Sequence, residues 1–538
     1  MKDFFTKPYI YLIIIAIGIG LKFYKLDQKF FWDDEIATIL HTSGIPMNTY
    51  EAKIPVNTVF NRSYFDKILE LNSRHLNIFD QVKGLMMMPQ LTPGNYYYLI
   101  FWIRLFGDGY MSYRYFSVFI FLLSLPVFFM FTRKLFQSKT AAWIAVSLYA
   151  VSPFFHAYSQ EARYYILWAL FIVAMDYLLL MAAEKQNRLW WGVYVVAGAL
   201  AIHTTILFSL IFLMHIIYYL RFHRVNWKPF FISLGIIFLC ALPWLIFIYI
   251  NRMTIENSMT WQVARSGHIG IGTILLWQLT DYLGVLFNPE VFHWGNVAFT
   301  VALVVAGLLL IVGSIVLIKK ASKKQALFVM LATFVGMVVI VSEDAVRNSF
   351  TSLLPRYQLL NYIGFILMLA FAGKLLLKKN SVVFGVLFVG LVFGGIASSK
   401  AISDNVSFGN RGDSPYHVAE AKNYFSGDQH VLIISDCNLF SGPYAFSMFM
   451  SLIHRCKDKN IDLIYAKPDY PDFSKKIDMS KYDAVYAMYL TDGLLKDLKK
   501  CFPKDMVLVD DGRLPGKRFP MYQIEPSKKL TKLQLKNK

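Results

Sequence analysis

Runs of about 20 apolar residues recur along most of the first 400 positions of this 538-residue chain, and each is long enough to cross a lipid bilayer. Hydrophobic residues make up 56% of the sequence, and the mean hydropathy is +0.45. Soluble domains of this length do not have that composition. The sequence therefore predicts a mainly α polytopic membrane protein, a bundle of about 11 to 13 transmembrane helices.

Eleven of these spans can be placed by hydropathy. The first follows Lys2 and Lys7 but lacks a small-residue cleavage site, so we expect an uncleaved helix rather than a signal peptide. The segment from Tyr96 to Phe106 is apolar but short, and it predicts an interfacial or re-entrant helix. The eleven spans lie near residues 8–24, 113–132, 139–155, 162–182, 188–203, 204–221, 229–250, 296–318, 325–342, 357–376 and 381–398.

Lysine and arginine concentrate in alternate loops between these spans, which explains the net charge of +19. With the N-terminus in the cytoplasm, every cytoplasmic loop is basic, as the positive-inside rule requires. Binding of nucleic acid is therefore disfavoured as the cause of the charge. The opposite side receives the loops 25–112, 251–295 and 343–356 and everything after residue 400. We expect that side to be the periplasmic face of a bacterial inner membrane, because the chain lacks ER-retention signals.

Residues 400–526 differ in character and predict a small extracytoplasmic α/β domain with a partly parallel sheet. Helix-like stretches near 415–425, 441–455 and 491–501 separate four short apolar runs that resemble buried strands. The runs are Val431–Ile434, Leu463–Tyr465, Ala484–Ala487 and Val507–Val509. No GxGxxG or Walker motif is present, so nucleotide binding is not supported. Residues 1–399 are expected to form the transmembrane domain, and the basic residues 527–538 a disordered tail.

Three consecutive carboxylates, Asp33, Asp34 and Glu35, follow an aromatic pair at the exit of the first span. One explanation is a solvated loop that caps a helix beginning near Ile36, since Asp is common at N-caps. The other is catalysis, because a carboxylate held near an apolar surface has a raised pKa and can take a proton from a hydroxyl. Both explanations can hold together.

Polar side chains also gather at the predicted outer mouth of the bundle. Tyr158, Ser159, Glu161 and Arg163 precede one span; Tyr and Arg are ordinary interfacial anchors there, but an acid beside a base favours a functional site. His203 lies between two short spans, where a lone histidine is more often a packed, hydrogen-bonded residue than a ligand.

Arg356 and Tyr357 open the span at residue 357, on the side where the positive-inside rule disfavours cations. A lone snorkelling arginine would explain this position. A phosphate site would explain it too, because the guanidinium offers a bidentate fork to phosphate oxygens and a helix start adds backbone donors.

Taken in order, these pieces resemble the GT-C superfamily of polyprenyl-phosphate-sugar-dependent glycosyltransferases. They are most similar to glycosyltransferase family 39, which includes the dolichyl-phosphate-mannose–protein mannosyltransferases and the aminoarabinose–lipid A transferase. The resemblance covers roughly residues 1–370, and six weak motifs in the family's order make it specific. The motifs are Trp32-Asp33-Asp34-Glu35, similar to W-x-D-E; Leu91 to Tyr98, similar to P-P-x-Y-Y; Arg104 to Gly107 with Tyr113-Arg114; Arg133 to Phe136; Tyr158 to Tyr164; and Pro355-Arg356-Tyr357.

The resemblance implies inverting transfer of a sugar from a polyprenyl-phosphate donor to a hydroxyl of an acceptor protein, glycan or lipid. Asp34 matches the family's catalytic Asp, Glu35 its neighbour, and Asp33 a variable position. Arg356 and Tyr357 match residues that approach the lipid phosphate, where charge develops on the leaving group.

Further candidates for the same site are Arg163, as a second phosphate ligand, and Tyr97, Tyr158, Glu161 and His203. No cofactor is assigned. Asp33, Glu35 and Glu161 carry hard oxygen ligands that suit a divalent metal, but the sequence shows no clustered ligand set. The chain has Thr92-Pro93-Gly94 where the family often has two prolines, so this loop is expected to differ in shape.

Two other functions are weighed against glycosyl transfer. A transporter or flippase of lipid-linked sugars predicts charges buried in mid-span and a pseudo-repeat of spans, and neither is evident in the sequence. A non-catalytic envelope scaffold would leave the carboxylate row and Arg356 without a role. Glycosyl transfer therefore remains the best interpretation of the sequence.

Overall fold

The computed structural model of the chain describes residues 2–29, 31–44, 56–61, 63–64, 77–89, 91–258, 270–288, 297–404, 430–436, 450–451, 453–454, 460–466, 481–488, 506–509 and 531–535. The chain divides into two compact units. The helical unit comprises Met1–Leu26, Pro89–Trp102 and Met111–Asp404, and the sheet unit comprises Asp27–Met88, Ile103–Tyr110 and Asn405–Lys538. The domain boundary predicted between residues 399 and 400 is not tested by this division and stays a prediction.

Eight helices among the described residues are long and apolar enough to cross a membrane. Helices α9 (Lys139–Val151) and α10 (Pro153–Ser159) are apolar enough together but bend by 58° at their junction, so they form a broken span or a re-entrant loop. Two shorter apolar helices are α12 (Arg188–Ile202) and α13 (Ser209–Phe222). The eight are α2 (Pro8–Phe23), α8 (Tyr110–Phe136), α11 (Tyr165–Lys185), α14 (Trp227–Ile250), α17 (Val297–Lys320), α18 (Lys323–Arg347), α19 (Leu359–Lys379) and α20 (Ser381–Asp404). All eleven predicted apolar segments are thus helical.

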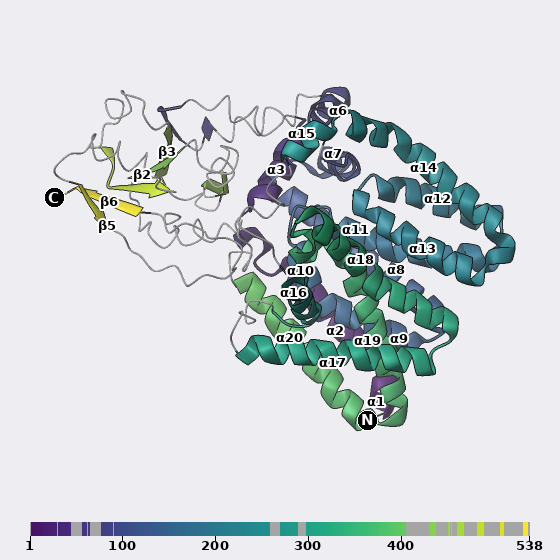
Figure 1. Cartoon of the computed structure of the whole chain (residues 1–538). Coiled ribbons are helices and arrows are strands. Elements are labelled where there is room, and N and C mark those ends of the chain that lie inside the picture. The colour runs from purple at the N-terminus through teal and green to yellow at the C-terminus, as the bar shows by residue number, and fades with distance from the viewer. Residues whose placement is uncertain are drawn as a thin grey trace. The chain divides into compact units, whose positions relative to one another are not determined.

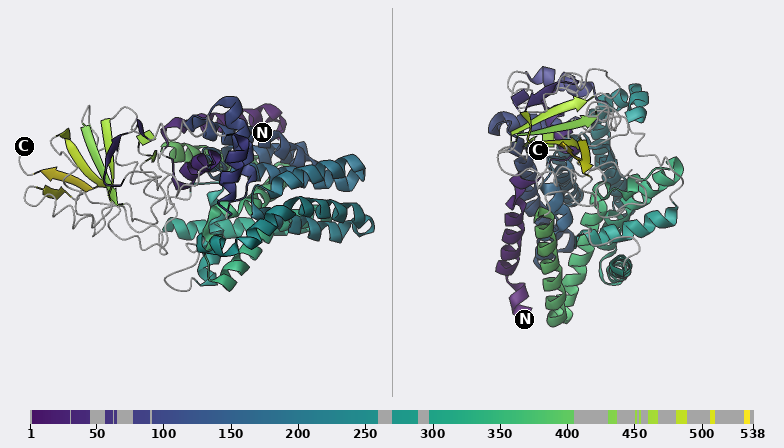
Figure 2. Two further views of the ribbon diagram at one scale, coloured as in Figure 1. Left: turned by 90° about the horizontal axis from the view of Figure 1, so that it is seen from above. Right: turned by 90° about the vertical axis from the view of Figure 1, so that its left-hand side faces the viewer.

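Helix α19 is the core of the helical unit, and it lies against α9, α18 and α20 (Figure 1). Its first ten residues, Leu359–Met368, are all buried, because neighbouring helices cover every side of that part of α19. Helices α2 and α20 run alongside each other (Figure 2). The remaining helices of this unit are α1 (Lys2–Thr6), α7 (Gly94–Phe106, shared with the sheet unit), α15 (Arg252–Ser258) and α16 (Ile271–Gly284).

The last turns of α8, α11, α13, α17 and α19 carry lysine or arginine, and the loops predicted to be cytoplasmic begin there. Helices α2 and α18 also end on a cation, Lys22 and Arg347, at loops predicted to lie on the other side. Tyr158–Tyr164 and Arg356 lie at the opposite ends of α11 and α19, which begin at Tyr165 and Leu359. The side of the membrane on which these ends lie remains a prediction.

The sheet unit contains a mixed six-stranded sheet in the order β1-β3-β2-β4-β6-β5 (Figure 2). Central strand β2 pairs in parallel with β3 and β4, and its residues Val431–Ile434 are all buried, as a central parallel strand requires. The strands are β1 (Val59–Asn61), β2 (His430–Asp436), β3 (Asn460–Ala466), β4 (Ala484–Met488), β5 (Met506–Val509) and β6 (Thr531–Leu535). The four predicted strands are β2 to β5.

Two strands lie where the sequence predicts none. Strand β1 comes from the first outer loop and pairs antiparallel with β3. Strand β6 falls in the tail predicted to be disordered; it pairs antiparallel with β4 and β5, and its leucines alternate with polar residues as in a strand. The predicted helices 415–425 and 491–501 and most of 441–455 lie outside the described residues.

Candidate functional site

The carboxylate row forms the first turn of helix α3 (Asp33–Thr42) in the sheet unit. The helix begins three residues earlier than predicted, so the three carboxylates lie inside it, where its N-terminal dipole favours negative charge. Glu35 is fully buried, and its Oε2 accepts a hydrogen bond from the Trp32 backbone N–H at 3.3 Å. Asp33 and Asp34 remain partly exposed. The capping explanation therefore fits Glu35, and Asp34 keeps surface for a substrate.

The other end of α3 is fixed against helix α6 (Ile78–Met86). The Gln81 side chain donates to the Thr42 carbonyl at 2.9 Å and accepts from Arg104, a residue of the family-like motifs, at 2.8 Å. A Cβ at Gly84 would lie 1.5 Å from the Gly44 carbonyl oxygen, so only glycine allows this approach. These contacts hold the helix that carries Asp34.

In the helical unit, Tyr158, Glu161 and Arg163 lie on α10 and on the turn that leads to α11. A proline after Ser152 disfavours helical backbone at Ser152 and ends α9 there, which produces the bend. The Ser117 hydroxyl donates to the Glu161 carbonyl at 2.5 Å, and the Arg163 N–H donates to the same carbonyl at 2.8 Å. The turn is therefore held at Glu161, whose side chain is fully buried.

Gln160 joins this turn to the ends of α2 and α20. Its amide donates to the carbonyls of Leu21, Lys22 and Tyr24 at 3.1–3.2 Å, which caps the C-terminus of α2. The Gln160 side-chain oxygen accepts a hydrogen bond from the Ser403 hydroxyl. Because that hydroxyl has only one proton to donate, His156 Nε2 is the donor to Ser403 Oγ, at 2.8 Å.

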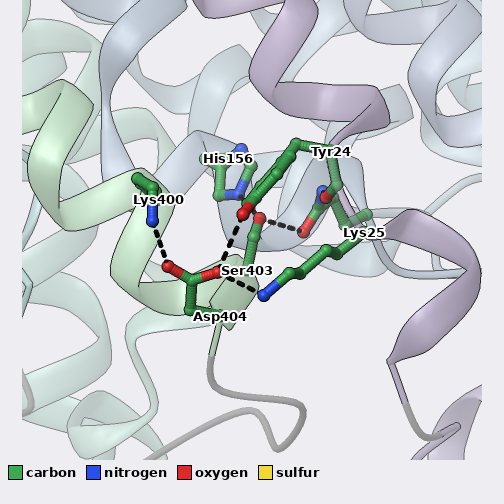
Figure 3. A network of polar contacts seen from close by, with 7 residues as sticks. Tyr24, Lys25, His156, Lys400, Ser403 and Asp404 are labelled. Atoms are coloured by element: carbon green, nitrogen blue, oxygen red, sulfur yellow. Dashed lines mark hydrogen bonds and ion pairs between the residues drawn. The ribbon is translucent and has the colours of Figure 1, made fainter.

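An ion cluster completes the network in Figure 3: Asp404 accepts from Lys25, Lys400 and Tyr24. The chain leaves the helical unit directly after Leu26 and again after Asp404. The network therefore fixes two of the three points at which the chain leaves the helical unit, and through Gln160 it also fixes the residue before Glu161.

Arg356 lies on the short helix η7 (Pro355–Tyr357), immediately before α19, and only 7% of its surface is exposed. Its guanidinium carbon is 5.5 Å from the centre of the Tyr357 ring. The preceding short helix η6 (Thr351–Leu353) is held by the Asp344 carboxylate, which accepts from the backbone N–H groups of Thr351 and Ser352, both at 2.8 Å. The arginine is thus a cation held in a fixed, mostly buried turn.

A row of aromatic rings joins the Tyr158 region to the start of α19. Tyr158 lies 4.8 Å from Tyr165 and 4.7 Å from Phe154, and Phe154 lies 4.7 Å from Tyr362, all between ring centres. Tyr362 is six residues after Arg356. The structure therefore brings α10, the start of α11 and the start of α19 together, whereas Asp33–Glu35 belong to the sheet unit.

His203 has a positioning role for the Thr92-Pro93-Gly94 element. The Gly94 N–H donates to the His203 carbonyl at 2.7 Å, and the Thr92 hydroxyl donates to the Thr204 carbonyl at 2.7 Å. A proline at position 94 would lack that N–H and could not make this hydrogen bond. Burial lowers the pKa of His203, which therefore favours the neutral imidazole.

Tyr97 lies on α7, which has 13 residues and is shorter than a span, as the sequence predicts. The side chain is 43% exposed, and partial burial raises the pKa of its hydroxyl. Tyr97 is therefore a neutral hydroxyl at physiological pH.

Gly94→Ala is expected to lower the free energy of unfolding by about 1–3 kcal/mol, the range for an overpacked site. The added Cβ would lie 2.5 Å from the His203 carbonyl oxygen, which is backbone and cannot rotate away. Gly192→Ala is the matched control, because a Cβ there meets nothing within 4 Å. Thermal unfolding in detergent measures both, and equal midpoints would contradict the close approach at Gly94.

Among the described residues, no three His, Cys, Asp or Glu side chains are grouped so that they could hold a metal ion. Sequence reasoning missed three polar residues that the structure places near the candidate residues: Gln160, His156 and Asp281. Asp281 had a usable signal, because it is an isolated carboxylate in the apolar stretch that precedes Tyr282 and Leu283.

Residues 90–247 match the sequence profile of the family described as dolichyl-phosphate-mannose-protein mannosyltransferase. The fold is similar to that of ArnT from Cupriavidus metallidurans, solved bound to undecaprenyl phosphate and in the apo state, with 12% identity, a TM-score of 0.51 and 97% of each chain covered. An oligosaccharyltransferase from Archaeoglobus fulgidus has 13% identity and a TM-score of 0.48, over 89% of this chain and 68% of that chain. No protein of curated function matches.

The fold is therefore that of a GT-C membrane glycosyltransferase, and the resemblance predicted from the motifs is confirmed. The fold likeness to ArnT extends beyond the predicted 1–370, since it covers 97% of the chain.

Proposed function

We propose that this protein is an inverting membrane glycosyltransferase that moves a hexosyl or pentosyl group from a polyprenyl-phosphate donor to an acceptor hydroxyl. The guanidinium of Arg356 carries the proposal, because it is held in a fixed turn at the start of α19 and its fork of donors suits the oxygens of a phosphate. ArnT, whose fold this chain shares, was solved with undecaprenyl phosphate, which supports a lipid phosphate as the ligand.

The residues take the following roles in this proposal. Asp34, partly exposed on the first turn of α3, removes the proton of the acceptor hydroxyl, which then attacks the anomeric carbon. The bond from that carbon to the phosphate oxygen breaks, and Arg356 stabilises the charge left on the phosphate, with Arg163 and Tyr357 as further donors. Glu35 supports α3, and Asp33 takes no part.

The acceptor is a protein, a glycan or a lipid, and the reaction takes place on the periplasmic side of a bacterial inner membrane. The experiment is direct: the purified protein in lipid nanodiscs receives undecaprenyl-phosphate-linked sugars together with membrane extract as the acceptor source. Mass spectrometry then looks for a sugar added to an acceptor. Mass spectrometry of envelope glycans from a deletion strain identifies the acceptor in cells.

Arg356→Glu is expected to weaken binding of undecaprenyl phosphate at least about tenfold, since a charge-assisted hydrogen bond is worth about 1.5–3 kcal/mol. Arg347→Glu is the control, because Arg347 is an exposed residue on the last turn of α18 that pairs only with Glu343 among the contacts described for it. Arg356→Lys separates geometry from charge, since lysine keeps the charge but loses the fork. Lipid binding in nanodiscs measures all three, and unchanged binding by Arg356→Glu would remove Arg356 from the phosphate site.

A further inference from the structure

Six buried polar side chains beside the Arg356 turn each keep a nitrogen or oxygen without a hydrogen-bond partner among the described residues. All six residues are 7% exposed or less. We call them the polar cluster: Gln278, Thr351, Ser352, Gln358, Asn361 and Tyr362. Such groups are rare in native proteins and each costs about 1–3 kcal/mol, so six in one place need an explanation.

The cluster comes from α16, η6 and the start of α19, which face one another. Gln278 and Tyr282 are one turn apart on α16, and Gln358 and Tyr362 are one turn apart at the start of α19. The rings of Tyr282 and Tyr362 are 5.6 Å apart, and the Gln278 amide donates to the Ser352 carbonyl. Side chains of the three elements therefore lie close together, with the Asn361 amide oxygen on the side of Gly336 of α18, where an added Cβ would be 2.7 Å from it.

The unpaired atoms form a mixed set of donors and acceptors. Gln278 and Asn361 present carbonyl oxygens, Gln358 presents an N–H group, and the other three present hydroxyls. Arg356 is the nearest cation along the chain, two residues before Gln358. A set of neutral amides and hydroxyls suits a neutral polyhydroxyl ligand and does not suit a phosphate or a lipid tail.

Asp281 adds a carboxyl group to the cluster. It lies on α16 between Gln278 and Tyr282. Loss of hydration raises the pKa of the Asp281 carboxyl well above its ordinary value, which favours the neutral form. A neutral carboxyl both donates and accepts hydrogen bonds, so Asp281 adds to the mixed set of donors and acceptors.

We propose that the polar cluster and Asp281 bind the sugar ring of the donor. This inference rests on the proposed function and names the part of the molecule that recognises the sugar. The sugar and the phosphate of the donor share one oxygen, so the groups that bind them must lie next to each other. Arg356 precedes Gln358 of the polar cluster by two residues. The amides and hydroxyls of the cluster pair with the sugar hydroxyls.

The test compares undecaprenyl phosphate with its glucose-, galactose- and mannose-linked forms, as ligands of the full-length protein in nanodiscs. Wild type is expected to bind at least one sugar-linked lipid more tightly than undecaprenyl phosphate. Asp281→Asn and Asn361→Leu should each reduce that preference about tenfold, while binding of undecaprenyl phosphate itself stays unchanged. Asn251→Leu, at the C-cap of α14, is the matched control.

The outcomes separate this inference from the proposed function. Variants that bind every lipid as wild type does, or a wild type without any preference for a sugar, would overturn the sugar subsite and leave the phosphate site standing. A wild type that binds none of these lipids would remove the proposed function and the subsite together. If Asn361→Leu does not fold, Thr351→Val takes its place, because it removes one hydroxyl at almost constant volume.

Discussion

Asp34→Asn is expected to lower the rate of sugar transfer by about 10²–10⁴-fold, the usual contribution of a positioned general base. Asparagine keeps the size of aspartate but cannot accept the proton of the acceptor hydroxyl. The fold should survive, because asparagine keeps the backbone carbonyl of position 34, which accepts from the Thr38 hydroxyl at 2.8 Å, and because the Glu35 cap is unchanged. The loss of the favourable interaction with the helix dipole costs about 0.3–1 kcal/mol.

Asp33→Asn is the matched control for this prediction. It removes the same charge from the same helical turn, and Asp33 is partly exposed like Asp34. Transfer of a sugar from an undecaprenyl-phosphate donor, followed by mass spectrometry, should fall for Asp34→Asn only. Transfer at the wild-type rate by Asp34→Asn shows that Asp34 is not the base, and equal losses in both variants point to the charge of the helix end instead.

The spans and the core strands were predictable, because each is encoded in a short stretch of sequence. An apolar run of about 20 residues needs no knowledge of its neighbours to be recognised as a span. Val431–Ile434 is recognisable as a central strand for the same reason, since it is apolar on both faces. The short spans α12 and α13 were also found, at the His203–Thr205 break between them.

The missed features depend on contacts between distant parts of the chain. Strand β1 has only three residues, and its partner β3 lies about 400 positions later. The Glu35 cap depends on where α3 begins, which is uncertain from sequence by several residues. Asp281 interacts with Tyr362, and Gln278 with Ser352, although these residues are more than 70 positions apart in the sequence. No local sequence pattern therefore reveals the polar cluster.

A second missed feature is a hydrogen-bonded triad inside the helical unit. Asp176 on α11 forms a hydrogen bond with His215 Nε2 on α13 at 2.8 Å. On the other side of the same ring, His215 Nδ1 lies 2.9 Å from the Tyr194 hydroxyl on α12. All three side chains are fully buried. Polar groups buried in mid-span are what a transporter predicts, so the triad needs its own test.

His215→Leu is expected to lower the free energy of unfolding by roughly 3 kcal/mol, because Asp176 would stay buried without its histidine partner. The double variant Asp176→Leu/His215→Leu should recover most of that loss, since apolar side chains can replace a buried ion pair at little cost. Thermal unfolding in detergent measures both, and sugar transfer per folded molecule should match wild type in the double variant.

The triad is enclosed, with no exposed surface for a substrate, so its role is to lock the short helices α12 and α13 onto α11. Loss of transfer by a stably folded double variant would contradict this and favour a proton path through the membrane domain.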